Sequence, residues 1–156
     1  MKRKKILFVS STGGHLAELL QLEPLFSKYD YLLVTEKTKS NLKLRDKYNV
    51  KYLIYGTRRE ILLYPFKFFL NVIKSFHYLR KFRPDFIITT GAHTSVPMCY
   101  LGKFFKAKVI FIETMANSSS RSLSGRLVYK RADLFIVQWE SMLKLYPKAK
   151  CFGVLE

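Results

Sequence analysis

The sequence predicts an α/β fold, a Rossmann-like parallel sheet with helices on both faces, in a single domain over residues 1–156. Short apolar runs alternate with helical segments about six times, a pattern typical of parallel sheets covered on both sides. The first run leads through Gly13-Gly14 into a helical segment. Polar clusters follow several runs, and ligands of such folds bind beyond the carboxyl ends of the strands. These observations favour one shared site at that edge.

The first half of the chain supplies three of the expected strands, at residues 5–10, 31–35 and 50–55. Residues 15–28 carry leucines at helical spacing, as in a helix packed on a sheet. Pro24 falls inside this segment, so we expect the helix to kink or end early. Residues 36–48 are polar and predict a loop with a helical turn.

The second half supplies three more strands, at residues 85–90, 108–112 and 134–137. Pro97 suits the first turn of a helix that runs to about residue 105. Ser122 or Ser124 can cap a helix that reaches residue 131. A short helix and a final stub complete the chain.

The segment 58–83 differs from an ordinary sheet-packed helix. Its polar residues Lys67, Asn71, Lys74 and Lys81 fall on one narrow line of a helix, and most of the remaining circumference is apolar. Pro84 ends it. A broad apolar face with basic ends favours a helix lying in a bilayer surface. The residues expected at the membrane are Arg58, Arg59, Phe66, Lys67, Phe69, Leu70, Ile73, Lys74, Phe76 and Lys81. The alternative is a crossover helix buried between the sheet and a partner.

Charge narrows the classes of partner. The formal net charge is +17 and the isoelectric point is near 10.0. Such an excess indicates an anionic partner: nucleic acid, an acidic bilayer surface or a phosphorylated ligand. Cys99 and Cys151 lack metal-ligand spacing, so we expect no metal site, and they suit a reducing cytoplasm. The apolar run behind the basic residues 1–5 is too short for a signal peptide or a membrane span.

The segment from Ser11 to His15 is the central motif. A strand that passes through Gly-Gly into a helix leaves backbone N–H groups that favour a phosphate. The spacings GxGxxG and GxxxxGK[ST] are both absent, so dinucleotide and P-loop sites are weakly supported. The simpler interpretation is a tight turn only.

Four side chains near the expected strand ends could have a catalytic or binding role, and each could instead have a purely structural role. His15 is either a general base or a helix-start residue bonded to a carbonyl, and His93 occupies a matching turn. Glu113 can bind a sugar hydroxyl, or it can be a surface carboxylate paired with Arg121 or Arg126. Trp139 serves equally as a packing, interface or ligand-contact residue.

The order and spacing of several motifs resemble one family over nearly the whole chain. The motifs are Ser-Thr-Gly-Gly-His at 11–15, Gly-Ala-His-Thr-Ser-Val-Pro at 91–97, Ile112-Glu113, Ser-Gly-Arg-Leu at 124–127, Ala132-Asp133, Gln138-Trp139, Tyr146-Pro147 and Gly153. They resemble the acceptor-side subunit of split lipid-linked-sugar glycosyltransferases. That family includes the membrane anchor of the eukaryotic enzyme that adds the second N-acetylglucosamine to dolichol-diphosphate sugar. It also includes bacterial capsule and exopolysaccharide subunits that enhance a β-1,4-galactosyltransferase. More distantly, the turns resemble those of the glycosyltransferase that makes lipid II.

The resemblance implies half of an enzyme, equivalent to the N-terminal half of a GT-B glycosyltransferase. A separate donor-binding subunit would bring the UDP-sugar, so this chain would bind no cofactor. This chain would hold a polyprenyl-diphosphate-linked sugar at the cytoplasmic face of the membrane, as a peripheral or monotopic protein.

The resemblance also implies residue roles. His15 would be the base and Glu113 would orient the sugar. The expected acceptor and phosphate contacts are Thr12, Gly13, Gly14, His93, Thr94, Ser95 and Asn117. The expected partner contacts are Gln138, Trp139, Val154 and Leu155. The residues themselves leave two other functions open: a basic RNA-binding module and a stand-alone nucleotide-binding enzyme. The favoured interpretation, a glycosyltransferase subunit, has no nucleic-acid partner.

Overall fold

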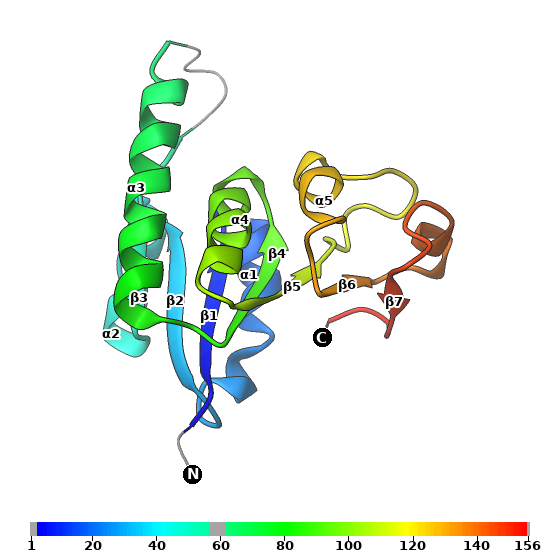
Figure 1. The fold of residues 1–156 in the computed structure, drawn as a ribbon, viewed down its shortest axis with the longest axis horizontal. Coiled ribbons are helices and arrows are strands. Elements are labelled where there is room, and N and C mark those ends of the chain that lie inside the picture. The colour runs from blue at the N-terminus through cyan, green and yellow to red at the C-terminus, as the bar shows by residue number, and fades with distance from the viewer. Residues whose placement is uncertain (1–2, 57–61, 156) are drawn as a thin grey trace.

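The computed structural model describes residues 3–56 and 62–155. They form a seven-stranded parallel sheet in the order β3-β2-β1-β4-β5-β6-β7 (Figure 1). The strands are β1 (Lys5–Ser10), β2 (Asp30–Glu36), β3 (Val50–Leu53), β4 (Phe86–Gly91), β5 (Lys108–Ile112), β6 (Leu134–Val137) and β7 (Lys150–Cys151). The Rossmann-like prediction is confirmed.

One strand was missing from the prediction. The six expected strands are present, but a seventh, β7, lies where the final stub at residues 151–156 was expected to begin, and it pairs Lys150 with Ile136 and Cys151 with Val137. Two residues carry too little hydrophobic pattern to indicate a strand. Hydrogen bonding to β6 holds these two residues in an extended strand that their local sequence does not predict.

The helical elements follow the expected positions with shorter extents. They are α1 (Gly14–Leu20), η1 (Glu23–Leu25), η2 (Lys39–Asn41), α2 (Leu44–Lys47), α3 (Tyr64–Phe82), η3 (His93–Ser95), α4 (Val96–Phe104), α5 (Leu123–Val128) and η4 (Glu140–Lys144). Pro24 lies in η1, so the segment expected as one helix is an α-helix followed by a separate 3₁₀ turn. Ser122 is the cap of α5, and its side chain accepts a hydrogen bond from the N–H of Gly125.

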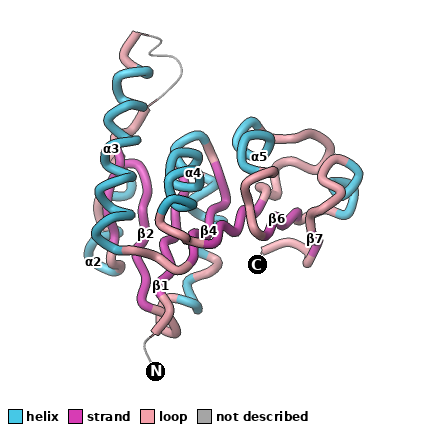
Figure 2. The backbone as a smooth tube through the Cα atoms, in the orientation of Figure 1, coloured by secondary structure: helices cyan, strands magenta, loops and turns pink. Residues whose placement is uncertain are grey.

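Helices cover both faces of the sheet. On one face Leu79 of α3, Met98 of α4 and Val128 of α5 join the core of buried strand residues. These three helices follow one another along the sheet (Figure 2). On the other face Leu16 and Leu19 of α1 pack with strand residues in a second core. Burying a large apolar side chain contributes about 1.5–3 kcal/mol, so these two cores hold the layers together.

The strand order reverses direction between β1 and β4. From β1 the chain moves outward through β2 to β3, then α3 returns it to β4 on the other side of β1. The loops that leave β1 and β4 therefore diverge to opposite faces. Such a switch point leaves a crevice beyond the carboxyl ends of the two strands.

The helix α3 turns its polar line toward the sheet. Asn71 is buried, and its side chain accepts from the N–H of Ile54 and donates to the carbonyl of Ile54. The Lys74 ammonium donates to the carbonyl of Tyr52. Leu79 still packs into the core, but Phe66, Phe69, Ile73 and Phe76 of α3 are exposed, unlike the apolar residues of an ordinary sheet-packed helix.

Candidate active site

A cavity of about 800 Å³ lies beyond the carboxyl ends of β1, β4 and β5. Its lining comes from segments that are far apart in the sequence. The lining residues are Gly14, His15, Ala17, Glu18, Gln21, Ala92, His93, Thr114, Met115, Ala116, Asn117, Ser122, Leu123, Ser124 and Leu155. The switch point thus brings together Gly14, His15, His93 and Asn117, four of the residues that the sequence predicts for this site.

The turn after β1 depends on Gly13. Its φ of 80° lies in the left-handed region, where a side chain would be strained. The carbonyl of Gly13 accepts the N–H groups of Leu16 and Ala17 and so begins α1. Thr12 and Gly13 are not among the residues that line the cavity. Their expected phosphate contact remains a prediction.

His15 is held by the end of β4. Its Nδ1 lies 2.8 Å from the carbonyl oxygen of Thr90, and the Thr90 hydroxyl donates to the carbonyl of His15 at 2.6 Å. A carbonyl only accepts, so Nδ1 carries the proton and Nε2 of the neutral ring is the basic nitrogen. Among the described residues, Nε2 has no hydrogen-bond partner. The ring also packs close to Gly91, where a Cβ would lie 3.5 Å from it.

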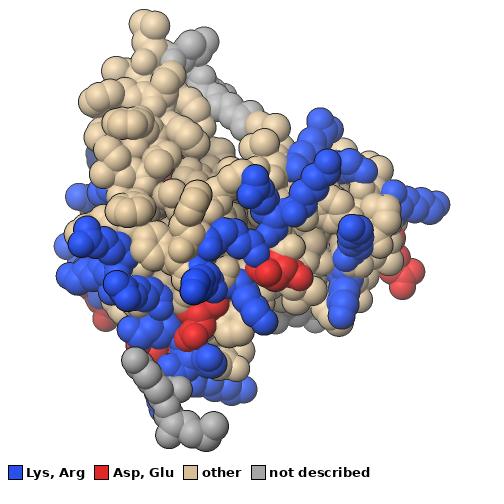
Figure 3. Space-filling view, viewed as in Figure 1, with Lys and Arg blue, Asp and Glu red and all other residues tan. Residues whose placement is uncertain are grey.

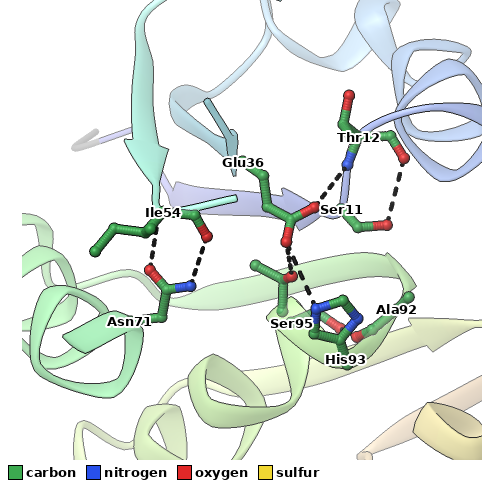
Figure 4. Close-up of polar contacts among 9 residues, drawn as sticks. Ser11, Thr12, Glu36, Ile54, Asn71, Ala92, His93 and Ser95 are labelled. Carbon is green, nitrogen blue, oxygen red and sulfur yellow. Dashed lines mark hydrogen bonds and ion pairs between the residues drawn. The ribbon is translucent and has the colours of Figure 1, made fainter. Parts of the chain in front are cut away.

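Glu36, at the end of β2, joins the two turns and was not expected from the sequence (Figure 4). Its side chain is 2% exposed. Oε1 accepts from the Thr94 hydroxyl at 2.7 Å and lies 3.6 Å from Nε2 of His93, while Oε2 accepts from the N–H of Thr12 at 3.4 Å. The one sequence signal was an acidic residue directly after the apolar run 31–35.

Thr94 and Ser95 face inward, in contrast to their expected contact with the acceptor. Both are buried. The Thr94 hydroxyl is bonded to Glu36, and the Ser95 hydroxyl donates to the carbonyl of Ala92 at 2.7 Å. These two hydrogen bonds hold the turn that carries His93, which lines the cavity.

Glu113 is buried and bonded, so the alternative of a surface carboxylate paired with arginine is wrong. It is 2% exposed. Oε2 accepts from the Tyr146 phenol at 2.8 Å and the Ser122 hydroxyl at 3.0 Å. Burial and the neighbouring carboxylate both raise the pKa of Tyr146, so the phenol stays protonated and donates. Glu113 does not line the cavity, and its predicted contact with a sugar remains untested.

Gly125 permits this arrangement. A Cβ at that position would lie 2.2 Å from Oε2 of Glu113 and 2.5 Å from the Tyr146 oxygen. The first turn of α5 therefore approaches the carboxylate closely only because it has no side chain there. The same turn carries Ser124, which lines the cavity.

Of the four expected partner contacts, Gln138 has an internal role. Gln138 is 3% exposed; its amide donates to the carbonyl of Glu113 and its Oε1 accepts from the N–H of Leu155. It therefore lies inside the chain rather than on the expected interface, because it connects β6 to β5 and to the C-terminal segment. Leu155 lines the cavity. Trp139 is 40% exposed, and its indole N–H donates to the carbonyl of Met115.

A smaller apolar groove of about 190 Å³ adjoins the cavity. Tyr64, Phe68, Val96 and Leu127 line it, and it shares His93, Leu123 and Ser124 with the cavity. The groove leads from the cavity toward the first turns of α3, which project beyond the carboxyl end of the sheet (Figure 1).

From Tyr64 to Phe76 the exposed side chains of α3 are apolar. Phe66 and Phe69 are 63% and 60% exposed, and Leu63, Ile73 and Phe76 are also exposed. Figure 3 shows this surface as a continuous patch without charged atoms, with lysine and arginine gathered below it and to its side. Arg58 and Arg59, expected at the same membrane contact, lie outside the described residues. Across the described ranges, no helix combines the length and hydropathy needed to cross a bilayer.

The chain matches a known protein family over nearly its whole length. The family model described as "Oligosaccharide biosynthesis protein Alg14 like" matches residues 6–155. The chain belongs to this Alg14-like family.

Curated relatives of this Alg14-like chain carry the name UDP-N-acetylglucosamine transferase subunit. The relative from Schizosaccharomyces pombe is 29% identical over 98% of this chain and 84% of its own length. The relative from Homo sapiens is 26% identical over 95% of this chain and 81% of its own length. The eukaryotic side of the expected resemblance is therefore confirmed.

Solved structures support the GT-B relationship of the fold. MurG of Acinetobacter baumannii aligns with a TM-score of 0.70 at 15% identity, over 88% of this chain and 42% of that protein. UDP-N-acetylglucosamine 2-epimerase of Rickettsia bellii aligns with a TM-score of 0.69 at 14% identity, over 97% of this chain and 45% of that protein. The Alg14-like chain thus spans less than half the length of these neighbours, consistent with one Rossmann-like half.

Proposed function

We propose that this chain is the acceptor-side subunit of a heteromeric UDP-sugar glycosyltransferase at the cytoplasmic face of a membrane. The family and the names of the relatives support a transferase subunit. The observation that carries the proposal is a sequence of adjoining features: a cavity with His15 in its wall, an apolar groove beside it that Tyr64 and Phe68 of α3 help to line, and the exposed apolar residues of the same helix. An acceptor with a sugar, a charged diphosphate and a polyprenyl chain matches that order.

His15 acts as the general base of the transfer. Nε2 takes the proton from a hydroxyl of the acceptor sugar as that oxygen attacks the anomeric carbon of the donor sugar. A glycosidic bond forms, the bond from the anomeric carbon to the UDP phosphate breaks, and UDP leaves with the electron pair. The Thr90 carbonyl supports this step, because its bond to Nδ1–H stabilises the imidazolium that results.

In this proposal the donor-binding half is a second polypeptide, because the curated relatives are named as subunits of a transferase. The cavity of this chain is open beyond the strand ends. The partner would close over this cavity with its UDP-sugar in place. The exposed Trp139, together with the C-terminal residues Val154 and Leu155, lies close enough to the cavity edge to serve that contact.

The apolar face of α3 supplies the membrane contact. Exposed phenylalanines insert between lipid headgroups, and the surrounding lysines and arginines attract anionic lipids. Because the first turns of α3 lie at the same end of the sheet as the cavity, a membrane on this face places lipid-linked sugar near His15. A capsular or exopolysaccharide pathway is the bacterial context that we predict for this chain.

Co-expression tests the proposal. Membranes containing this chain and a candidate donor-binding subunit are incubated with radiolabelled UDP-N-acetylglucosamine or UDP-galactose and a polyprenyl-diphosphate-linked sugar. We expect transfer with both chains and none with either chain alone. Absence of transfer with both chains, or full activity of this chain alone, would contradict the split-enzyme proposal. Tight UDP-sugar binding by this chain alone would favour the stand-alone enzyme instead.

A further inference from the structure

Glu18 is a buried carboxylate in the cavity wall. It lies one helical turn after His15 on α1, so both side chains are on the same face of the helix. It is 8% exposed and lines the cavity together with His15 and Asn117. None of the ion pairs among the described residues involves Glu18.

The two oxygens of Glu18 differ in their bonding. Oε1 accepts from the Thr114 hydroxyl at 2.8 Å and from the N–H of Met115 at 2.9 Å. Oε2 is buried and accepts no hydrogen bond within the described part of the chain. An unsatisfied buried acceptor costs roughly 1–3 kcal/mol, and more when it is charged. Such a group calls for a reason other than stability.

Two other buried side-chain atoms without partners do not share this position. They are the hydroxyl oxygens of Ser10 and Thr35, which are neutral, and neither residue lines the cavity. Glu18 alone of these three combines negative charge, a fixed first oxygen and a place in the cavity wall. The unpartnered oxygen of Glu18 therefore belongs to the candidate site rather than to the core.

We infer that Glu18 binds a hydroxyl group of the acceptor sugar and thereby selects which hydroxyl meets His15. This inference rests on the proposed function. An ionised carboxylate only accepts hydrogen bonds, and a sugar ring presents O–H donors on neighbouring carbons. Oε2 is shielded in the structure, but the terminal torsion of glutamate is soft, so a small rotation of the carboxylate presents it to a donor in the cavity.

The geometry gives Glu18 a specificity role distinct from the base. His15 is held at Nδ1 by Thr90, and Glu18 is held at Oε1 by Thr114 and Met115. Two acceptors one helical turn apart, Nε2 of His15 and the carboxylate of Glu18, constrain the sugar at two of its oxygens. Rotation of the sugar that brings a different hydroxyl to His15 removes the donor from Glu18. Glu18 is therefore a determinant of acceptor regiochemistry.

The test compares Glu18→Gln with wild type in the reconstituted two-subunit enzyme. The acceptors are a short-chain polyprenyl-diphosphate-linked sugar and a series of analogues that each lack one hydroxyl. Gln keeps the size of the side chain and an oxygen for Thr114 and Met115. We expect the acceptor KM to rise roughly 10- to 100-fold, the loss typical of a hydrogen bond to a charged group, with the donor KM unchanged.

The analogue series separates recognition from a structural effect. For one deoxy acceptor, wild type and Glu18→Gln should have equal KM, because the bonding hydroxyl is already absent. Glu23→Gln, at an exposed carboxylate outside the cavity lining, is the matched control. If Glu18→Gln leaves the acceptor KM unchanged, or raises it equally for every analogue, the inference is overturned. The proposed function still stands in that case, provided that the wild type transfers sugar. Absence of transfer by wild type overturns both.

Discussion

Nδ1 of His15 and the carbonyl oxygen of Thr90 are 2.8 Å apart, and the Thr90 hydroxyl returns a 2.6 Å bond to the His15 carbonyl. This reciprocal pair ties the first turn of α1 to the end of β4. Because β4 is the strand across the switch point from β1, the pair spans the crevice in which ligands of such sheets bind. It also fixes the ring so that Nε2 is its basic nitrogen.

Replacing His15 tests its role as the base. For His15→Ala in the two-subunit enzyme we expect kcat to fall roughly 10²- to 10⁴-fold, because the acceptor hydroxyl loses its proton acceptor. Single-turnover rates measure the effect. His77→Ala, at an exposed histidine of α3, is the control and should retain turnover. Near-normal turnover of His15→Ala would remove the residue from this role.

The bond between Glu36 and Thr94 should stabilise the turn before α4. In a double-mutant cycle with Glu36→Gln and Thr94→Val, we expect a coupling free energy of about 1–3 kcal/mol, because both groups are buried and the acceptor is a carboxylate. Urea denaturation of the four proteins measures it. A coupling near zero would show that Thr94 does not contribute stability through Glu36.

The phenol of Tyr146 should contribute to folding through Glu113. Tyr146→Phe removes a buried donor at 2.8 Å from Oε2, so we expect the free energy of unfolding to fall by about 1.5–3 kcal/mol. Tyr100→Phe is the matched control, since its hydroxyl bonds the carbonyl of Leu127 at an exposed position. Equal losses in the two variants would contradict a special contribution from the carboxylate.

Liposome flotation tests the apolar face of α3. We expect this chain to float with vesicles containing anionic lipid, and we expect Phe66→Asp with Phe69→Asp to abolish flotation, because the variant places charge in the bilayer. Lys81→Glu should weaken binding at low salt only. Phe152→Asp is the control, an exposed phenylalanine near the C-terminus.

The outcomes of flotation separate the alternatives for α3. If wild type does not float, and the double variant instead loses its donor-binding partner, the face is a protein interface. If binding is to RNA rather than vesicles and decreases with salt, the basic RNA-binding module is favoured.

Ionised Asp133 should stabilise the fold, and this stabilisation should be lost in acid. Burial acts to raise its pKa, but the Lys103 ammonium and the N–H of Val109 outweigh burial and hold the pKa below the usual value for aspartate. A carboxyl whose pKa is lower in the folded state stabilises the fold above its unfolded pKa, about 3.9, and loses that contribution as pH falls through the folded pKa.

Thermal unfolding as a function of pH measures this component. The Tm of wild type should exceed that of Asp133→Asn near neutral pH, and the difference should shrink on acidification below about pH 4. A difference in Tm that does not depend on pH would show that the charge of Asp133 contributes nothing.

The sequence by itself determined the fold class and the place of the site. Apolar runs of the right length predicted six strands because a strand buried on both faces has no alternative to apolar side chains. Gly13-Gly14 and the segment 91–97 marked the turns because such backbone needs small residues. His15 and His93 could be placed in one site because the carboxyl ends of parallel strands meet at one edge.

Only the tertiary structure decided which polar residues serve the cavity and which serve the fold. Glu113 and Gln138 are as polar in sequence as His15, yet their partners come from distant segments and lie inside the protein. Glu18 and Glu36 carried no sequence signal strong enough to separate them from ordinary helix and strand-end carboxylates. Burial and hydrogen bonding depend on contacts between residues far apart in the chain, and local pattern does not encode those contacts.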